Sequence, residues 1–154
     1  MSNYFIRPPK SEKEWKDYLF FRWEVLRKPL GMSQDSLEDD LESTSYHLMG
    51  VDYDKKVIAS GRVHFNSPEE AQIRYMAVNE NLKRKGIGSE IVKKLEEFAS
   101  SKGAQKMVLN ARENALSFYL SLGYTEKGPY QSDTGIPHSK MEKDLSQIIT
   151  VMEQ

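Results

Sequence analysis

The sequence contains no cysteine among its 154 residues. Disulfide bonds, thiolate metal sites and cysteine nucleophiles are therefore excluded together. Long apolar runs are also missing: neither residues 1–15 nor any later stretch has the uncharged apolar length that a signal peptide or a membrane-spanning helix needs. We expect a soluble protein of the cytoplasm that has no membrane partner.

An excess of charge of one sign is missing as well. Lysine and arginine number 22, aspartate and glutamate number 23, and the formal net charge is -1. A surface that binds nucleic acid neutralises many phosphates, so this balance argues against nucleic acid as a partner. The length is that of one average domain, and we expect residues 1–154 to form a single domain.

Positive charge is absent from one long segment. Residues 29–54 contain no lysine or arginine, and carboxylates gather within residues 35–42. These are Asp35, Glu38, Asp39, Asp40 and Glu42. Such a run either forms a solvated surface or attracts a cationic amine, and the sequence leaves both open.

Hydrophobic periodicity outlines the first helix. Ser11 and Glu14 form a capping-box pattern ahead of apolar residues at helical spacing, which predicts a helix over 12–27. The apolar residues that recur at this spacing are Trp15, Leu19, Trp23 and Leu26.

Later segments alternate between strand and helix patterns. The expected strands are 46–51, 57–65, 71–78 and 105–110, the expected helices are 88–102 and 114–121, and a closing hairpin joins 124–130 to 138–145 around a turn at 133–137. This order predicts an α/β fold, a mixed sheet of about six to seven strands with helices on both faces.

The connection between two of these strands indicates where a ligand binds. A right-handed crossover through helix 88–102 makes strand 105–110 parallel to strand 71–78. Ligands of such sheets bind at the carboxyl ends of the parallel strands. We therefore expect the chemistry near Val78 and Asn110.

A basic, glycine-containing turn precedes helix 88–102. It reads Lys83-Arg84-Lys85-Gly86-Ile87-Gly88-Ser89. Backbone N–H groups and the dipole at a helix N-terminus favour an anion, and glycine lets a phosphate approach without meeting a Cβ. The turn is not a P-loop, and Ile91 stands where a dinucleotide fingerprint has its third glycine. A solvated basic turn is the alternative interpretation.

Three motifs follow one another in order and spacing. They are Met76-Ala77-Val78, Lys83-x-x-Gly86-x-Gly88, and Leu109-Asn110-Ala111-Arg112 followed by Asn114-Ala115-x-x-Phe118-Tyr119-x-x-x-Gly123-Tyr124. Together they resemble the core of the GNAT-type N-acetyltransferase superfamily, most strongly over residues 71–145. The turn Gly135-Ile136-Pro137-His138 is similar to the small bacterial ElaA-like branch.

The resemblance implies a GNAT-like acyl-CoA N-acyltransferase fold and a specific reaction. Acetyl passes from acetyl-CoA, the co-substrate, to a primary amine by direct attack in a ternary complex. Backbone N–H groups around Gly86 and Gly88 would hold the pyrophosphate, and the strand end Met76–Val78 would pair with the pantetheine arm. Lys83 stands where the family commonly has Gln or Arg, and an ammonium lacks the planar fork of arginine.

Tyr119 occupies the position of the family's general acid, which protonates the departing thiolate. The proton transfer is chemically reasonable if the site lowers the pKa of this phenol toward that of a thiol. A packed aromatic residue with an ordinary hydroxyl is the alternative. The implied cofactor-binding residues are Met76, Ala77, Val78, Lys83, Arg84, Lys85, Gly86, Ile87, Gly88, Ser89, Asn110, Arg112, Asn114 and Tyr119.

Several of these assignments have plain alternatives. Asn110 fits a turn or cap, and Arg112 fits a solvated side chain. His138 is either an acceptor-site group or an exposed turn residue.

No general base follows from the sequence. The central strand offers Gln72, Arg74 and Tyr75, with Glu69 and Glu70 just before it, so water-relayed deprotonation of the amine is expected. The three histidines, at positions 47, 64 and 138, are too scattered for a metal pattern, and we expect no metal.

Two other functions fit the same turn. One is a non-catalytic module that binds coenzyme A or acetyl-CoA, and the other is a nucleotide-binding regulator. The acceptor, a small-molecule or protein amine, stays open, and a homodimer is compatible with the sequence.

Overall fold

The computed structural model describes residues 3–132 and 134–146, so Asp133 of the predicted turn lies outside the described residues. The chain divides into two compact units. Unit 1 comprises Met1–His64 and Tyr75–Leu95, and unit 2 comprises Phe65–Arg74 and Glu96–Gln154. We take each unit by itself.

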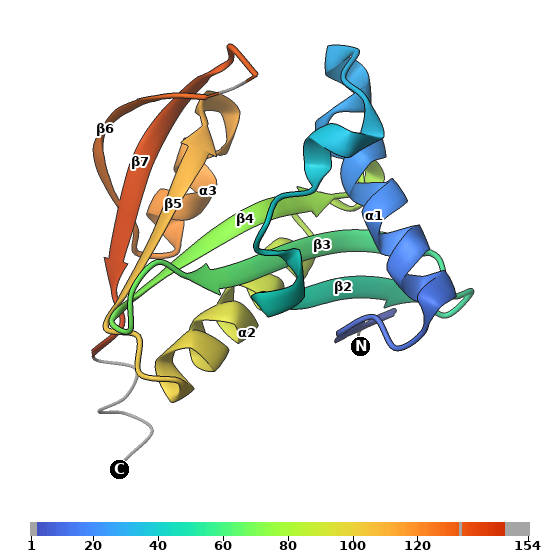
Figure 1. Cartoon of the computed structure of the whole chain (residues 1–154), viewed down its shortest axis with the longest axis horizontal. Helices are drawn as coiled ribbons and strands as arrows, with labels where there is room; N and C mark the ends of the chain where they lie inside the picture. Colours follow the sequence, from blue (N-terminus) through green and yellow to red (C-terminus); the bar gives the residue numbers. More distant parts are fainter. Residues whose placement is uncertain (1–2, 133, 147–154) are drawn as a thin grey trace. The chain divides into compact units, whose positions relative to one another are not determined.

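The strands of the described chain hydrogen-bond in the order β1-β2-β3-β4-β5-β7-β6 (Figure 1). Their bounds are β1 Tyr4–Arg7, β2 Tyr46–Asp52, β3 Val57–Phe65, β4 Glu70–Val78, β5 Lys106–Arg112, β6 Thr125–Gln131 and β7 Pro137–Asp144. The helices are α1 Glu12–Leu26, α2 Ile87–Ser101 and α3 Leu116–Ser121. Short 3-10 turns are η1 Lys28–Leu30, η2 Gln34–Leu37, η3 Glu42–Thr44, η4 Glu80–Leu82 and η5 Glu113–Ala115. The predicted mixed α/β sheet is confirmed.

Helix α1 begins as predicted and packs its apolar residues against the core. The Ser11 hydroxyl accepts a hydrogen bond from the N–H of Glu14 at 3.1 Å, which caps the helix. The fully buried residues of α1 are Tyr18, Phe21 and Arg22. Of the apolar residues at helical spacing, Trp15, Leu19 and Leu26 are partly buried and pack against the core cluster that contains Tyr18 and Phe21.

Strand β1 was not predicted. It has four residues, too few for a clear alternation, and it pairs antiparallel with β2. Strand β2 in turn pairs antiparallel with β3, as the sequence indicated. Short edge strands of this kind are recognised from their partner rather than from their own pattern.

Helices α1 and α2 pack on opposite faces of the strands of unit 1. Met49, Val51 and Ala77 join α1 in one apolar cluster. A Cβ added at Gly50 would lie 2.6 Å from Ile87 Cδ1 of α2, and one at Gly61 would lie 2.7 Å from Ile91 Cγ2. Because successive strand residues point to opposite faces, the two helices cover different faces, as predicted for this sheet.

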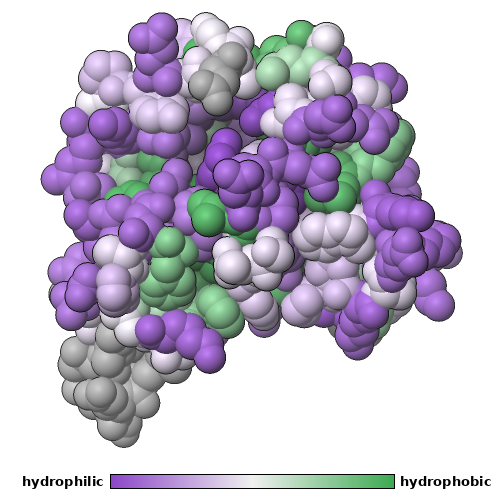
Figure 2. All heavy atoms as spheres, in the orientation of Figure 1, coloured by the Kyte–Doolittle hydropathy of each residue, from purple (hydrophilic) through white to green (hydrophobic). Residues whose placement is uncertain are grey.

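Unit 2 is built around an antiparallel set of strands. Strand β5 pairs with β7 over its whole length, and β7 pairs with β6. Strand β5 also pairs with the start of β4, in parallel, from Glu70–Lys106 to Gln72–Val108. The predicted parallel arrangement and closing hairpin are confirmed. Figure 2 shows mainly hydrophilic side chains on the face that it draws.

Candidate active site

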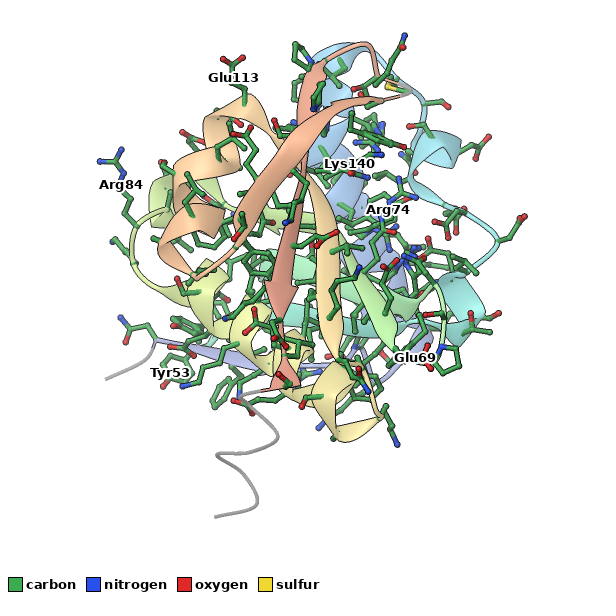
Figure 3. The ribbon with its side chains drawn as sticks, turned by 90° about the vertical axis from the view of Figure 1, so that its left-hand side faces the viewer. Tyr53, Glu69, Arg74, Arg84, Glu113 and Lys140 are labelled. Carbon is green, nitrogen blue, oxygen red and sulfur yellow. The ribbon has the colours of Figure 1, made fainter. Side chains whose placement is uncertain are left out.

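The basic turn of unit 1 connects η4 to α2. Arg84 and Gly86 both have left-handed backbone angles, with φ of 68° and 92°. Ile87 is 2% exposed and anchors the start of α2, while Lys83, Arg84, Lys85 and Gly86 are exposed. The Arg84 side chain extends away from the ribbon (Figure 3). The turn therefore exposes its backbone to solvent, together with its charged side chains.

The backbone N–H groups of this turn are available. Within the described residues, the N–H groups from Arg84 to Ser89 have no hydrogen-bond acceptor, and the first helical bond runs from Glu90 N to Gly86 O at 3.0 Å. A Cβ at Gly86 would meet no atom within 4 Å, so the space above it is open. Orphaned N–H groups at a helix N-terminus fit a diphosphate.

The side chain of Lys83 has another partner. Its Nζ lies 2.9 Å from Glu80 Oε2, in a pair exposed to solvent. Exposed ion pairs of this kind contribute little, about 1 kcal/mol or less. Lys83 is therefore free to exchange this carboxylate for a phosphate at small cost.

The end of β4 carries an unusual backbone residue. Tyr75 has φ of 58° without being glycine, and the Ser60 hydroxyl donates to its carbonyl oxygen at 2.9 Å. Ala77 packs into the apolar cluster with α1, and Met76 and Val78 are half-buried. A left-handed residue redirects the peptide groups that follow it.

Tyr119 lies on α3 in unit 2. Its ring packs edge-on against Phe118 at 4.9 Å and Tyr124 at 5.7 Å, and it is 6% exposed. Its carbonyl accepts the N–H groups of Leu122 and Tyr124. The hydroxyl has no hydrogen-bond partner among the described residues. Tyr119 therefore has both the packed ring that one interpretation expects and a hydroxyl proton that is available for donation, as the other requires.

Burial raises the pKa of the Tyr119 phenol above its ordinary value. The condition that the site lowers this pKa is therefore not met, because an apolar pocket penalises the phenolate. The phenol stays protonated at neutral pH, which an acid requires.

A buried polar triad lies behind Tyr124. The Tyr124 hydroxyl donates to Glu96 Oε2 at 2.8 Å, and Lys143 Nζ lies 3.0 Å from Glu96 Oε1. Glu96 is 3% exposed. Burial and the Glu96 carboxylate raise the pKa of Tyr124. The triad fixes the residue that packs on Tyr119 and was not predicted from the sequence.

Unit 2 brings Arg112, Asn114 and the Ile136–His138 turn together. A hollow of about 330 Å³ is lined by Arg112, Glu113, Asn114, Ile136 and Pro137. His138 faces Arg112 in the β5–β7 register, and Asn110 faces Lys140. The Glu113 side chain points outward (Figure 3). These residues form one wall, whereas the turn Lys83–Ser89 belongs to unit 1.

The side chains of this wall are partly dehydrated. Arg112 is half-buried, and this burial lowers the pKa of its guanidinium. His138 Nδ1 lies 2.7 Å from the carbonyl oxygen of Ile136. Because a carbonyl only accepts, Nδ1 carries the proton and Nε2 is left as an acceptor in the neutral ring.

The carboxylates near the start of β4 have structural partners. Glu70 accepts from Asn66 at 2.9 Å and lies 3.3 Å from Lys106, and these contacts lower its pKa. A low pKa makes Glu70 a weak base. Glu69 and Glu70 line a separate hollow of about 680 Å³ in unit 2, together with residues of β5, β6 and β7. The described residues assign no general base.

The acidic segment 35–42 is partly neutralised. Arg22 forms a bidentate pair with Glu42 at 3.0 and 3.1 Å, and Arg62 forms one with Asp39 at 2.8 and 2.9 Å. Both arginines are 0% exposed. Asp39 and Glu42 are therefore neither a solvated face nor an attractant for a cation. The sequence offers one signal for this network: Arg22 and Arg62 each stand within an otherwise largely apolar helix or strand pattern.

Within residues 3–132 and 134–146, no group of three or more His, Asp or Glu side chains is arranged as a metal site. No helix in this part of the chain has the length and apolar character to cross a bilayer.

Comparison with known proteins gives matches over most of the chain. The sequence model of the acetyltransferase (GNAT) domain matches residues 24–145. The uncharacterised N-acetyltransferase YjcF of Bacillus subtilis is 32% identical over 136 residues, which cover 88% of this chain and 96% of YjcF.

Solved structures share the fold. Escherichia coli ElaA superposes with a TM-score of 0.75 at 22% identity, covering 94% of this chain and 100% of ElaA. An aminoglycoside 6'-N-acetyltransferase in complex with coenzyme A superposes with a TM-score of 0.74 at 14% identity, covering 92% of this chain and 97% of that one.

Proposed function

Because this chain belongs to the GNAT acetyltransferase family and is an enzyme of that class, we propose that it transfers acetyl from acetyl-CoA to a primary amine by direct attack in a ternary complex. Family membership favours this function over a non-catalytic coenzyme A-binding module. One observation carries the choice of donor: the run of unpartnered N–H groups from Arg84 to Ser89 at the start of α2.

The turn would bind the donor mainly through its main chain. N–H groups around Gly86 and Gly88 hold the diphosphate, and Lys83, Arg84, Lys85, Ile87 and Ser89 complete the turn. Met76, Ala77 and Val78 pair with the pantetheine arm as an added strand. A structure of the same fold in complex with coenzyme A supports this choice of ligand.

Tyr119 would supply the proton that the departing thiolate takes up. Its phenol is neutral because burial raises its pKa, and its hydroxyl is not engaged by a described residue. The amine nitrogen forms the new bond to the acetyl carbon, the carbon–sulfur bond breaks, and the thiolate receives the phenolic proton. Asn110, Arg112 and Asn114 would contact the donor.

The amine would lose its own proton through water. No described carboxylate near β4 is suited to act as the base, so positioning and polarisation of the acetyl carbonyl supply most of the acceleration. His138 lies in the wall with Arg112 and presents an acceptor atom, Nε2, toward which an ammonium can donate. We assign it to the acceptor side.

The remaining proposals concern context. We propose that residues 1–154 work as a single catalytic domain in the cytoplasm, on a small-molecule or protein amine. A homodimer fits this function.

The test combines ligand binding with one substitution. We expect saturating acetyl-CoA to raise the Tm by about 5 °C or more, as for a ligand present at about 100 times its Kd. Tyr119→Phe should lower kcat about a hundredfold in a thiol-release assay, because general acid catalysis is lost. Its Kd for coenzyme A should stay within about twofold of wild type.

The control is Tyr53→Phe, which removes a hydroxyl from a side chain that is 65% exposed. It should match wild type in rate and binding. The assay should use a small amine, a polyamine, an aminoglycoside and a lysine-containing peptide in parallel. Absence of a thermal shift with acetyl-CoA would contradict the proposed donor, and an unchanged kcat in Tyr119→Phe would remove the assigned acid.

A further inference from the structure

Tyr75 holds a conformation that its residue type disfavours. Its φ is 58°, and its ring is buried, with 8% of the residue exposed. A left-handed backbone brings Cβ close to the carbonyl oxygen, and only glycine avoids this penalty. Such residues persist where the surroundings fix them, and they gather at functional sites. The contacts that fix Tyr75 are therefore informative.

Two buried cations lie against the Tyr75 ring. The guanidinium carbon of Arg22 is 3.9 Å from the ring centroid, and that of Arg62 is 4.9 Å from it. Both arginines are 0% exposed, where cation–π attraction is strongest because water does not compete. On the backbone side, the Ser60 hydroxyl donates to the Tyr75 carbonyl at 2.9 Å. The ring and the carbonyl group of Tyr75 are thus held by different residues.

The two guanidinium groups are themselves fixed in place. Arg22 is bidentate to Glu42, and Arg62 is bidentate to Asp39 with a further contact of 2.8 Å to Glu42. Glu42 therefore joins both arginines. Each planar fork is locked by two parallel bonds, which sets the orientation of the guanidinium plane.

The same hydrogen-bond donor is left without a partner in both arginines of this network. The Nε atoms of Arg22 and Arg62 are buried and have no hydrogen-bond partner. A buried donor without a partner is unfavourable, so the arrangement does not maximise hydrogen bonding. Besides Glu42, both guanidinium groups share contact with the ring of Tyr75.

We infer that Arg22 and Arg62 are positioning residues, which hold Tyr75 in its left-handed conformation and so direct the peptide groups of Met76–Val78 toward the pantetheine arm of the donor. This inference rests on the proposed function. It predicts that the arginines act on the strand end and leave the diphosphate-binding turn Lys83–Ser89 unaffected.

Two probes separate the strand end from the turn. Coenzyme A carries both the diphosphate and the pantetheine arm, whereas adenosine 3′-phosphate 5′-diphosphate carries the diphosphate alone. The variants are Tyr75→Leu, which keeps every arginine–carboxylate pair, Tyr75→Phe, which keeps the ring, and Arg62→Lys, which keeps the charge. Leucine is not β-branched, so it tolerates a positive φ about as well as tyrosine.

We expect Tyr75→Leu and Arg62→Lys to weaken coenzyme A binding about tenfold, measured by titration calorimetry, because a buried cation–π contact is lost. Binding of the nucleotide should change less than about twofold. Tyr75→Phe should restore coenzyme A affinity to within about threefold of wild type. Arg7→Lys is the matched control, since Arg7 forms a bidentate pair with Glu14 outside this network.

Each other outcome has a definite meaning. Equal loss of both ligands, or of neither, in Tyr75→Leu would overturn the inference while wild type still binds coenzyme A. A Tyr75→Phe variant as weak as Tyr75→Leu would overturn it too. If wild type itself fails to bind coenzyme A, the proposed function fails. Arg62→Lys is interpreted only if its circular dichroism spectrum matches that of wild type. If it does not, Tyr75→Leu alone decides the outcome.

Discussion

Unit 1 concentrates positive charge in two places that differ in every other respect. Lys83, Arg84 and Lys85 are exposed, and the N–H groups beside them have no described acceptor. Arg22 and Arg62 are fully buried, and each is bidentate to a carboxylate. The first cluster has backbone donors that an anion from solvent can reach, whereas the arginines of the second are already paired with carboxylates and closed off from solvent.

The difference follows from desolvation. A guanidinium removed from water is stable only beside a carboxylate, so the buried pair had to be neutralised within the protein. An exposed lysine keeps its water and can exchange it for a ligand. Charge inside the unit therefore fixes the structure, and we propose that charge at the turn serves recognition. The following variants test this division.

The largest effect should come from Glu42→Gln. This change leaves Arg22 and Arg62 with less negative charge than they need, and we expect the free energy of unfolding to fall by about 3 kcal/mol or more. Urea unfolding measures it, with a loss in Tm of about 8 °C. Lys83→Gln is the counterpart at the turn, and should change stability by no more than about 0.5 kcal/mol. Equal effects of the two variants would remove the distinction.

A medium effect is expected from Gly86→Ala. Alanine at a φ of 92° is strained, so the variant should lose about 1 kcal/mol of stability and, because the turn shifts, about tenfold in coenzyme A affinity. Gly31→Ala is a matched control: Gly31 has φ of 71° and open space where a Cβ would lie. It should show the same loss of stability with no loss of binding. Loss of affinity in both variants would show that backbone strain, and not the turn, sets the affinity.

The smallest effect concerns pH. His47 is buried, donates from Nε2 to the Glu42 carbonyl at 2.8 Å, and accepts at Nδ1 from Tyr18. Burial lowers its pKa below the ordinary value near 6.5, and together with the Arg22 and Arg62 charges it outweighs the contacts with Glu42, which raise this pKa. The unfolded chain then binds a proton first as pH falls, so stability is complete above about pH 6.5 and declines below it.

His47→Gln should therefore flatten the Tm profile between pH 7 and pH 5, which differential scanning calorimetry measures. Lys83→Gln should keep the slope of wild type over the same range, because the turn carries no such group. A wild-type Tm that is constant over this range would contradict the assignment of a neutral, buried His47.

Much of the fold could be predicted because period and punctuation agree along most of the chain. The helix over 88–102 and the strand over 71–78 were predicted to within about two residues, since caps and alternation coincide there. Strand β1 was missed because four residues carry no period. The burial of Arg22 in α1 was not predicted, because a charged residue carries no hydrophobic signal.

The candidate site divides in the same way. The turn Lys83–Ser89 could be located from glycine spacing, and Tyr119 from the resemblance, and their roles stay predictions. The partners of Asp39 and Glu42 could not be found, because they come from α1 and β3 and depend on how those elements pack. The raised pKa of Tyr119 depends on burial, which no local pattern gives.

Gly50 and Gly61 leave room for α2, the helix that begins in the turn Lys83–Ser89. A Cβ at position 61 would lie 2.6 Å from Met76 Sδ and 2.7 Å from Ile91 Cγ2, and one at position 50 would lie 2.6 Å from Ile87 Cδ1. Any larger residue there must lift the helix or displace the strand end. Positions 50 and 61 should therefore couple the placement of α2 to that of the strand end, although neither glycine belongs to the proposed binding surface.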